Sequence, residues 1–214
     1  MINEHLQVEN LTSFNWEGAL RGMRNPKESW AKSDSGMFYT PEEDDAIFQM
    51  GPNDHKLAMT LARAGKDHRK FLRQIFVSCD IVAPWYFWKE YETYQVGTVE
   101  NSTSQMHKMG SRPLTKADFV IDEWDHYDEE LLALINRRIE QYKRHNGKAQ
   151  WRALIQIIPA SFIYRRTCTL NYEVLANMYH SRKDHKLIEW HEFLDQMIAG
   201  LPYPELFTLE GGDN

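Results

Sequence analysis

Residues 156–190 place Arg165, Arg182 and two asparagines around what the sequence indicates is a strand, a turn and a helix. Arg165 and Arg182 carry planar guanidinium forks, which match phosphate or carbonyl oxygens better than a lysine ammonium does. Asn171 and Asn177 add amides; the alternative for each is a helix N-cap or a satisfied buried amide. For the arginines the alternative is a surface or intersubunit ion pair. The combination predicts a site for a phosphorylated ligand.

A second polar segment, residues 97–113, begins at Gly97 and carries five hydroxyl side chains. Hydroxyls and turn amides donate readily to phosphate or to the edge of a pyrimidine. Ser102, Thr103 and Ser104 are therefore candidate substrate contacts, and an ordinary surface turn is the alternative.

Other reactive residues form weaker patterns. The nine histidines include three Asp-His pairs, but no pair repeats a metal-ligand spacing such as His-Glu-x-x-His. The acidic run from Asp122 to Glu130 precedes a predicted helix, whose dipole it compensates. The sequence also has no glycine-rich phosphate loop, nucleophile elbow or paired catalytic cysteines. We therefore expect no metal site.

The composition is that of an acidic globular protein. A chain of 214 residues with 42% hydrophobic content can bury one sizeable core, and its net charge of -6 argues against a nucleic-acid polymer as partner. Two cysteines cannot build a disulfide framework, so a reducing, cytoplasmic setting is expected. The N-terminal residues are polar where a signal peptide is apolar, and no stretch approaches about 18 consecutive apolar residues. We expect no membrane partner.

Hydrophobic periodicity predicts helices that alternate unevenly with a few strands. Strands are expected over residues 6–11 and 74–82, because the first alternates and the second is rich in β-branched residues. Helices are expected over residues 15–24, 53–64, 85–94, 128–142 and 184–200. Residues 26–52 are expected to form a long loop with one helical turn. These elements predict a single α+β domain over residues 1–214.

The C-terminal half resembles the flavin-dependent thymidylate synthases. The matching positions are Pro159, Tyr164-Arg165, Thr169-Leu170-Asn171, Leu175, Asn177 and Arg182. Further upstream, that family carries Arg-His-Arg, seven residues and a serine after a strand, an Ala-Pro pair and an aromatic helix. Ala83-Pro84 and residues 85–94 supply this context, whereas the signature is degenerate and its serine falls on Ser102, Thr103 or Ser104. The resemblance covers about the last 60 residues and, more weakly, roughly residues 70–110.

The resemblance implies an α+β subunit with a helix-flanked sheet, in a homotetramer whose sites combine several subunits. It implies C5 methylation of dUMP, a pyrimidine deoxynucleotide, to dTMP, with methylenetetrahydrofolate as carbon donor and with FAD reduced by NADPH as hydride donor. On the substrate side it implies Arg165, Arg182 and a hydroxyl among residues 102–104, with Arg182 catalytic near the pyrimidine ring. On the cofactor side it implies Gln74, Asn171 and Asn177.

Two departures from the family pattern affect the cofactor side. The Arg-His-Arg positions hold no cation in the registers that place the serine at Ser102 or Ser104. The family's Asn-Ala-Arg becomes Asn171-Tyr172-Glu173, which removes a cation that meets the flavin. Arg69, Arg73 and Lys89 are possible replacements. One alternative is a flavin-independent one-carbon transfer, such as hydroxymethylation, to a pyrimidine deoxynucleotide; another is a non-catalytic nucleotide-binding oligomer.

Overall fold

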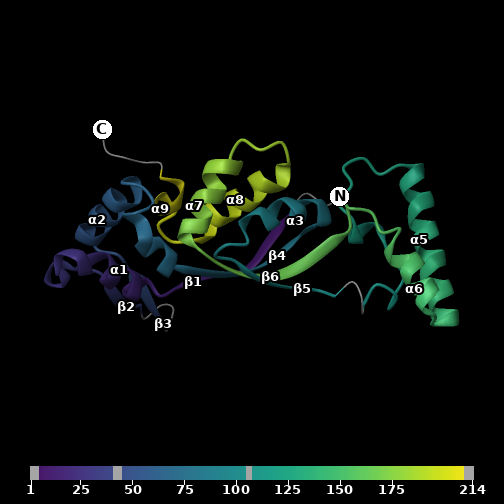
Figure 1. Cartoon of the computed structure of the whole chain (residues 1–214), viewed down its shortest axis with the longest axis horizontal. Helices are drawn as coiled ribbons and strands as arrows, with labels where there is room; N and C mark the ends of the chain where they lie inside the picture. Colours follow the sequence, from purple (N-terminus) through teal and green to yellow (C-terminus); the bar gives the residue numbers. More distant parts are fainter. Residues whose placement is uncertain (1–4, 41–44, 105–107, 210–214) are drawn as a thin grey trace.

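An antiparallel four-stranded sheet forms the centre of the chain, which the structure, a computed structural model, describes over residues 5–40, 45–104 and 108–209. The strands lie in the order β1-β4-β6-β5 across the sheet. Their bounds are Gln7–Phe14 for β1, Phe76–Pro84 for β4, Ile163–Asn171 for β6 and Val99–Ser102 for β5. In Figure 1 this sheet occupies the middle of an elongated molecule.

Alternation along β4 and β6 separates a core face of the sheet from an open face. Val77, Cys79 and Ile81 are buried, whereas the intervening Ser78 and Asp80 are partly exposed. Successive side chains of a strand point to opposite faces, so residues paired across two strands share a face. The register pairs Asp80 with Thr167 and Val82 with Arg165, which places Arg165 on the open face.

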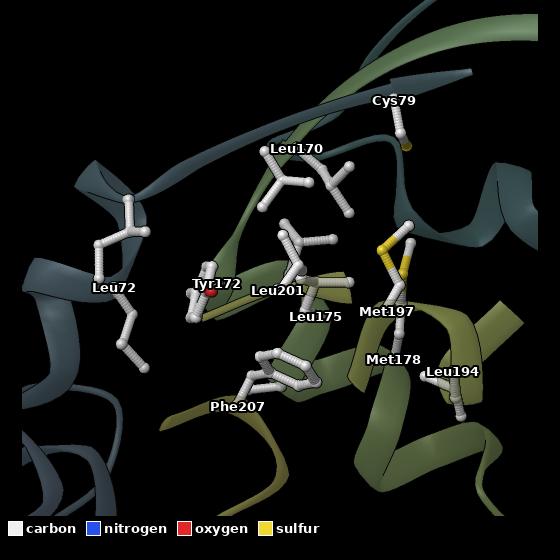
Figure 2. Packing of buried hydrophobic residues seen from close by; sticks show 14 of the residues in the cluster. Leu72, Cys79, Leu170, Tyr172, Leu175, Met178, Leu194, Met197, Leu201 and Phe207 are labelled. Carbon is white, nitrogen blue, oxygen red and sulfur yellow. The ribbon is translucent and has the colours of Figure 1, made fainter. Parts of the chain in front are cut away.

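Three helices cover the core face of the sheet: α3 (Trp85–Tyr91), α7 (Tyr172–Arg182) and α8 (Ile188–Gly200). Figure 2 shows Leu170 of β6 above a layer of apolar side chains from these helices, among them Leu175, Met178, Leu194 and Met197. Burial of each such side chain contributes about 1.5–3 kcal/mol. This core fixes the orientation of α7, which carries the candidate site residues Asn177 and Arg182 and is capped by Asn171.

A second group of helices packs at the other end of the sheet, on the left of Figure 1. It comprises α1 (Trp16–Arg24), α2 (Pro52–Arg63), the 3-10 helix η3 (Arg69–Gln74) and α9 (Glu205–Thr208). The ring of Tyr172, the first residue of α7, makes edge contacts with Trp16 at 5.1 Å and with Phe207 at 5.3 Å between centroids. The helices that surround the start of α7 are therefore joined to the sheet by one aromatic cluster.

The segment predicted as a loop over residues 26–52 contains a hairpin, so that prediction was incomplete. Two 3-10 turns, η1 (Asn25–Lys27) and η2 (Trp30–Lys32), lead into β2 (Gly36–Thr40) and β3 (Asp45–Gln49). Phe48 of β3 stacks on Trp16 at 5.5 Å, and buried Asp54 accepts hydrogen bonds from Ser33 and Ser35. Contacts with distant residues therefore hold this segment.

The remaining helices form an arm on the right of Figure 1, α5 (His126–His145) and α6 (Lys148–Ile155), with a small core of their own that includes Ile135, Ile139 and Leu154. Two further 3-10 turns are η4 (Glu92–Tyr94) and η5 (Lys116–Asp118). Within the described residues, no helix is long and apolar enough to span a membrane.

Candidate functional site

Arg182 lies at the C-terminal end of α7, between α3 and α8. Its Nη1 is 3.1 Å from Oε2 of Glu90, and its Nε donates to the hydroxyl of Tyr94 at 3.0 Å. The guanidinium carbon is 5.2 Å from the ring centroid of Trp190, within cation–π distance. Aromatic rings and one carboxylate thus fix the fork in place while its side chain stays 15% exposed.

Arg165 occupies a different environment, on the open face of the sheet. Its Nη1 is 2.7 Å from Oε2 of Glu9 and 3.4 Å from Oδ2 of Asp80. The hydrogen bond that Arg165 donates to Glu9 and the charges of both carboxylates raise the pKa of Arg165. Within one chain this side chain is already engaged by two acids, as the ion-pair alternative expects.

The predicted hydroxyl loop over residues 97–113 contains the short strand β5. Its Val99 to Ser102 pair with β6, and the amide of Thr103 donates to the carbonyl of Arg165 at 2.9 Å. The hydroxyl of Ser102 donates to the carbonyl of Thr103 at 3.0 Å. The structure therefore brings Ser102, Thr103 and the backbone of Arg165 together; residues 105–107 lie outside the described chain.

Arg166, the neighbour of Arg165 on β6, anchors β5 from the core side through an ion pair, the alternative weighed for both arginines. Its Nη1 is 2.8 Å from Oε1 of Glu100, and its guanidinium carbon is 4.3 Å from the ring centroid of Trp88. Strand alternation places Arg165 and Arg166 on opposite faces. Their different roles could have been predicted from the sequence, because adjacent residues of a strand point to opposite faces of the sheet.

The two asparagines lie along α7, but each amide has an internal partner. Asn171 is the N-cap of α7, where its Oδ1 accepts from the amide of Val174 at 3.0 Å. Asn177 accepts through Oδ1 from Nη2 of Arg69 at 3.4 Å. Arg69 belongs to η3, so the structure joins Asn177 to the 3-10 helix that ends with Gln74.

Glu173, between the two asparagines, is the partner of Arg69. Nε of Arg69 lies 2.8 Å from Oε2 of Glu173, with side-chain exposures of 11% and 7%. The N–H is not directed at that oxygen, so the contact is a charge pair more than a directed hydrogen bond. The positive charge of Arg69 is therefore largely cancelled.

The other side of η3 borders a cavity of about 900 Å³. Lys27, Lys32, Lys70 and Gln74 line it together with apolar residues such as Phe71. Two acids, Glu28 and Asp67, lie on the same wall, so the lysines leave a small excess of positive charge. Of these lining residues only Gln74 was expected from the sequence, because no local pattern brings η1, η2 and η3 together.

Both cysteines are buried and lie opposite each other on β4 and β6. Burial raises the pKa of Cys168 to about 12 and raises that of Cys79 further. A thiol acts as a nucleophile through its thiolate, so neither residue provides one at neutral pH. Among the described residues no group of three or more histidines, cysteines or acids could hold a metal ion.

Three solved structures share this arrangement of helices and strands. A thymidylate synthase X (ThyX) from Helicobacter pylori with FAD and dUMP has 14% sequence identity and a TM-score of 0.71, over 96% of this chain and 97% of that chain. A second structure of that enzyme, complexed with FAD and dUMP, has 14% identity and a TM-score of 0.72, covering 95% and 98%. A UMP/dUMP methylase, PolB from Streptomyces cacaoi bound with 5-Br dUMP, has 15% identity and a TM-score of 0.57, covering 92% and 89%.

The chain therefore has an α+β fold with a helix-flanked sheet, as predicted. More particularly, this is the fold of the flavin-dependent thymidylate synthases, which confirms the resemblance at the level of structure. No protein-family model and no curated protein matches the chain.

The residues on the α7 face of η3 do not fit the pyrophosphate of a flavin dinucleotide. A pyrophosphate requires cations or free amide donors to offset its loss of hydration. Here Glu173 is a buried carboxylate, and Arg69 is paired with it. Of the other possible replacements, Lys89 lies over the ring of Trp85, while Arg73 is exposed.

Proposed function

We propose that this protein is a thymidylate synthase-like enzyme that transfers a one-carbon unit from methylenetetrahydrofolate to C5 of dUMP. The observation that carries the proposal is the match of almost the whole chain to solved structures that hold dUMP or 5-Br dUMP. Methylation with FAD and NADPH, expected from the resemblance, is one form of this reaction. The transfer of a carbon to C5 is its minimal form.

Arg182 is proposed as the group that binds a carbonyl of the pyrimidine. Loss of the N3 proton to water puts negative charge on the ring carbonyl oxygen and makes C5 a stronger nucleophile for carbon–carbon bond formation. A guanidinium aimed at that oxygen stabilises the charge by about 3 kcal/mol, by analogy with oxyanion donors. Because both cysteine thiols are buried, the ring nitrogen must supply the electrons without attack by a cysteine.

The lysine-lined cavity is proposed as an anion site for the same reaction. Lys27, Lys32 and Lys70 suit a phosphate or the carboxylates of the folate, and Phe71 offers an aromatic wall. Arg182 does not line this cavity. In the homotetramer that the resemblance implies, one site combines residues of several chains. Arg182 of one chain and the lysine-lined cavity of another would then serve the same substrate.

Stabilisation by nucleotide tests the proposal. A ligand at 100 times its dissociation constant adds about 2.7 kcal/mol to the free energy of unfolding. We expect dUMP to raise the melting temperature, and deoxyuridine, which lacks the phosphate, to raise it much less. Equal effects of the two compounds, or no effect of dUMP, would contradict the proposed substrate.

A further inference from the structure

The charge arrangement between η3 and α7 bears on how the proposed one-carbon transfer ends. We propose that the Arg69–Glu173 pair closes this face to a flavin dinucleotide, and that the reaction is redox-neutral and leaves a hydroxymethyl group on C5. This inference rests on the proposed function, because it assumes dUMP and methylenetetrahydrofolate as reactants.

Arg69 and Glu173 carry opposite charges and are both largely buried. Glu173 is 5% exposed and paired with Arg69, so the two charges largely cancel and leave no net positive charge for a pyrophosphate that approaches α7. Arg69 is the cation nearest to it, at 2.8 Å, and its Nη2 also donates to Asn177. An anion at this position would have to displace Glu173 from Arg69 and leave a buried carboxylate without its partner.

Asn171 and Asn177, the amides expected to meet the cofactor, have partners within the chain. Asn171 uses Oδ1 to cap α7, and Asn177 uses Oδ1 to accept from Arg69. Gly97, at a φ of 91°, brings the preceding turn against the same end of the helix, where an added Cβ would lie 3.0 Å from Val174. The side-chain oxygens of both asparagines and the turn at Gly97 are thus packed against this chain's own residues along α7.

The proposed reaction needs no reductant. C5 forms a bond to the methylene carbon of the donor and loses its proton, which water accepts. The bond between that carbon and the folate nitrogen then breaks: the folate nitrogen keeps the electron pair, takes a proton from water and leaves as tetrahydrofolate, while electrons from the ring nitrogen form an exocyclic methylene group. Water adds to that carbon to give a hydroxymethyl group. No hydride is consumed, and dihydrofolate is not formed.

Three proteins test the role of the pair: the wild type, Glu173→Gln, and the double variant Arg69→Gln/Glu173→Gln. The first substitution frees the cation and keeps nearly the same shape, whereas the second removes both charges. We expect purified wild-type protein to carry no flavin absorbance. We expect Glu173→Gln to bind added FAD about tenfold or more tightly than the wild type, and the double variant to lose that gain.

The product tests the chemistry. Wild-type protein incubated with dUMP and methylenetetrahydrofolate, without FAD or NADPH, should form hydroxymethyl-dUMP and tetrahydrofolate, as measured by mass spectrometry. Product formation that requires added FAD, a methylated product, or flavin retained by the wild type would overturn the inference. A Glu173→Gln protein that binds FAD no better than the wild type would overturn the role of the pair.

Different results would contradict the proposed substrate and the proposed redox-neutral reaction. If dUMP stabilises none of the three proteins, the proposed function itself is wrong. If dUMP stabilises all three and FAD is bound and required, only the redox-neutral reaction is wrong.

Discussion

Arg69 of η3 and Glu173 of α7 place opposite, largely buried charges 2.8 Å apart beside Asn177. The glutamate stands where the resemblance implies a cation, and it engages an arginine that was a candidate replacement for that cation. The pair therefore shows what the second departure, Glu173, does in this fold: it neutralises a nearby cation. This chain thus shares the fold of the similar structures, which hold FAD, but lacks a free cation at position 173.

Arg182→Ala is expected to abolish the stabilisation by dUMP. The substitution removes a fork held by Glu90 and Tyr94, and with it the proposed partner of the pyrimidine carbonyl. Arg182→Lys retains the charge but not the planar fork, so it should recover only part of the effect. Melting temperatures with and without dUMP measure both variants; an unchanged shift in Arg182→Ala would remove this residue from the site.

Asp54→Ala is expected to destabilise the protein by about 3–5 kcal/mol, because it leaves a buried arginine without a counter-charge. The Asp54 carboxylate accepts from Nε of Arg24 at 2.5 Å and from Ser33 and Ser35 at 2.7 Å each. Chemical denaturation measures the loss. The matched variant Ser33→Ala removes one hydrogen bond and should cost about 0.5–1.5 kcal/mol; equal losses would show that the Arg24 charge is compensated elsewhere.

The same carboxylate should make stability depend on acid pH. Burial raises the pKa of Asp54, but the hydrogen bonds from Ser33, Ser35 and Arg24 outweigh it, so the net pKa is below the ordinary 3.8. Its contribution is present above that ordinary value and is lost as pH falls through the lowered one. The free energy of unfolding should therefore decrease more steeply from neutral to acid pH for the wild type than for Asp54→Asn.

His5 should have the opposite dependence. Its hydrogen bond with Glu192, at 2.8 Å, and the charge of Asp122 raise its pKa above 6.5 against the effect of burial. The stabilisation is full below 6.5 and is lost as pH rises through the higher folded pKa. His5→Gln should thus cost more stability at about pH 5.5 than at about pH 8.5. A cost independent of pH would show that the charge of His5 contributes nothing.

Both thiols should be unreactive in the folded protein. Burial raises the pKa of Cys168 to about 12, and Cys79 faces it across β4 and β6. Titration with an aromatic disulfide reagent at neutral pH should detect thiols only after denaturant is added. Rapid reaction of either cysteine in the native state would contradict the burial and would return a cysteine nucleophile to consideration.

Much of the fold could be predicted from local pattern. The strand near residue 76 and the long helix α5 follow from β-branched and amphipathic runs, and Gly65, just after α2, has a φ of 98°, which glycine adopts readily at a helix end. On α8 the apolar Trp190 is buried and its neighbour His191 is exposed, as the amphipathic pattern of residues 184–200 requires. In such segments the chain's own periodicity determines the structure.

The elements that the sequence missed depend on distant partners. Strand β5 has only four residues, Val99–Ser102, and is stabilised by pairing with β6 at the edge of the sheet. The β2–β3 hairpin packs Phe48 on Trp16. Likewise, the Glu173 substitution is visible in the sequence, but its pairing with Arg69 depends on how η3 packs against α7.

Release of tritium from dUMP labelled at C5 tests the central claim most directly, because the label leaves only when C5 forms its new bond. The assay contains purified protein, methylenetetrahydrofolate and labelled dUMP, each with and without FAD and NADPH. We predict release that requires the folate and the protein and is lost in Arg182→Ala. Absence of release under every one of these conditions would contradict the assignment of this fold to one-carbon transfer at C5.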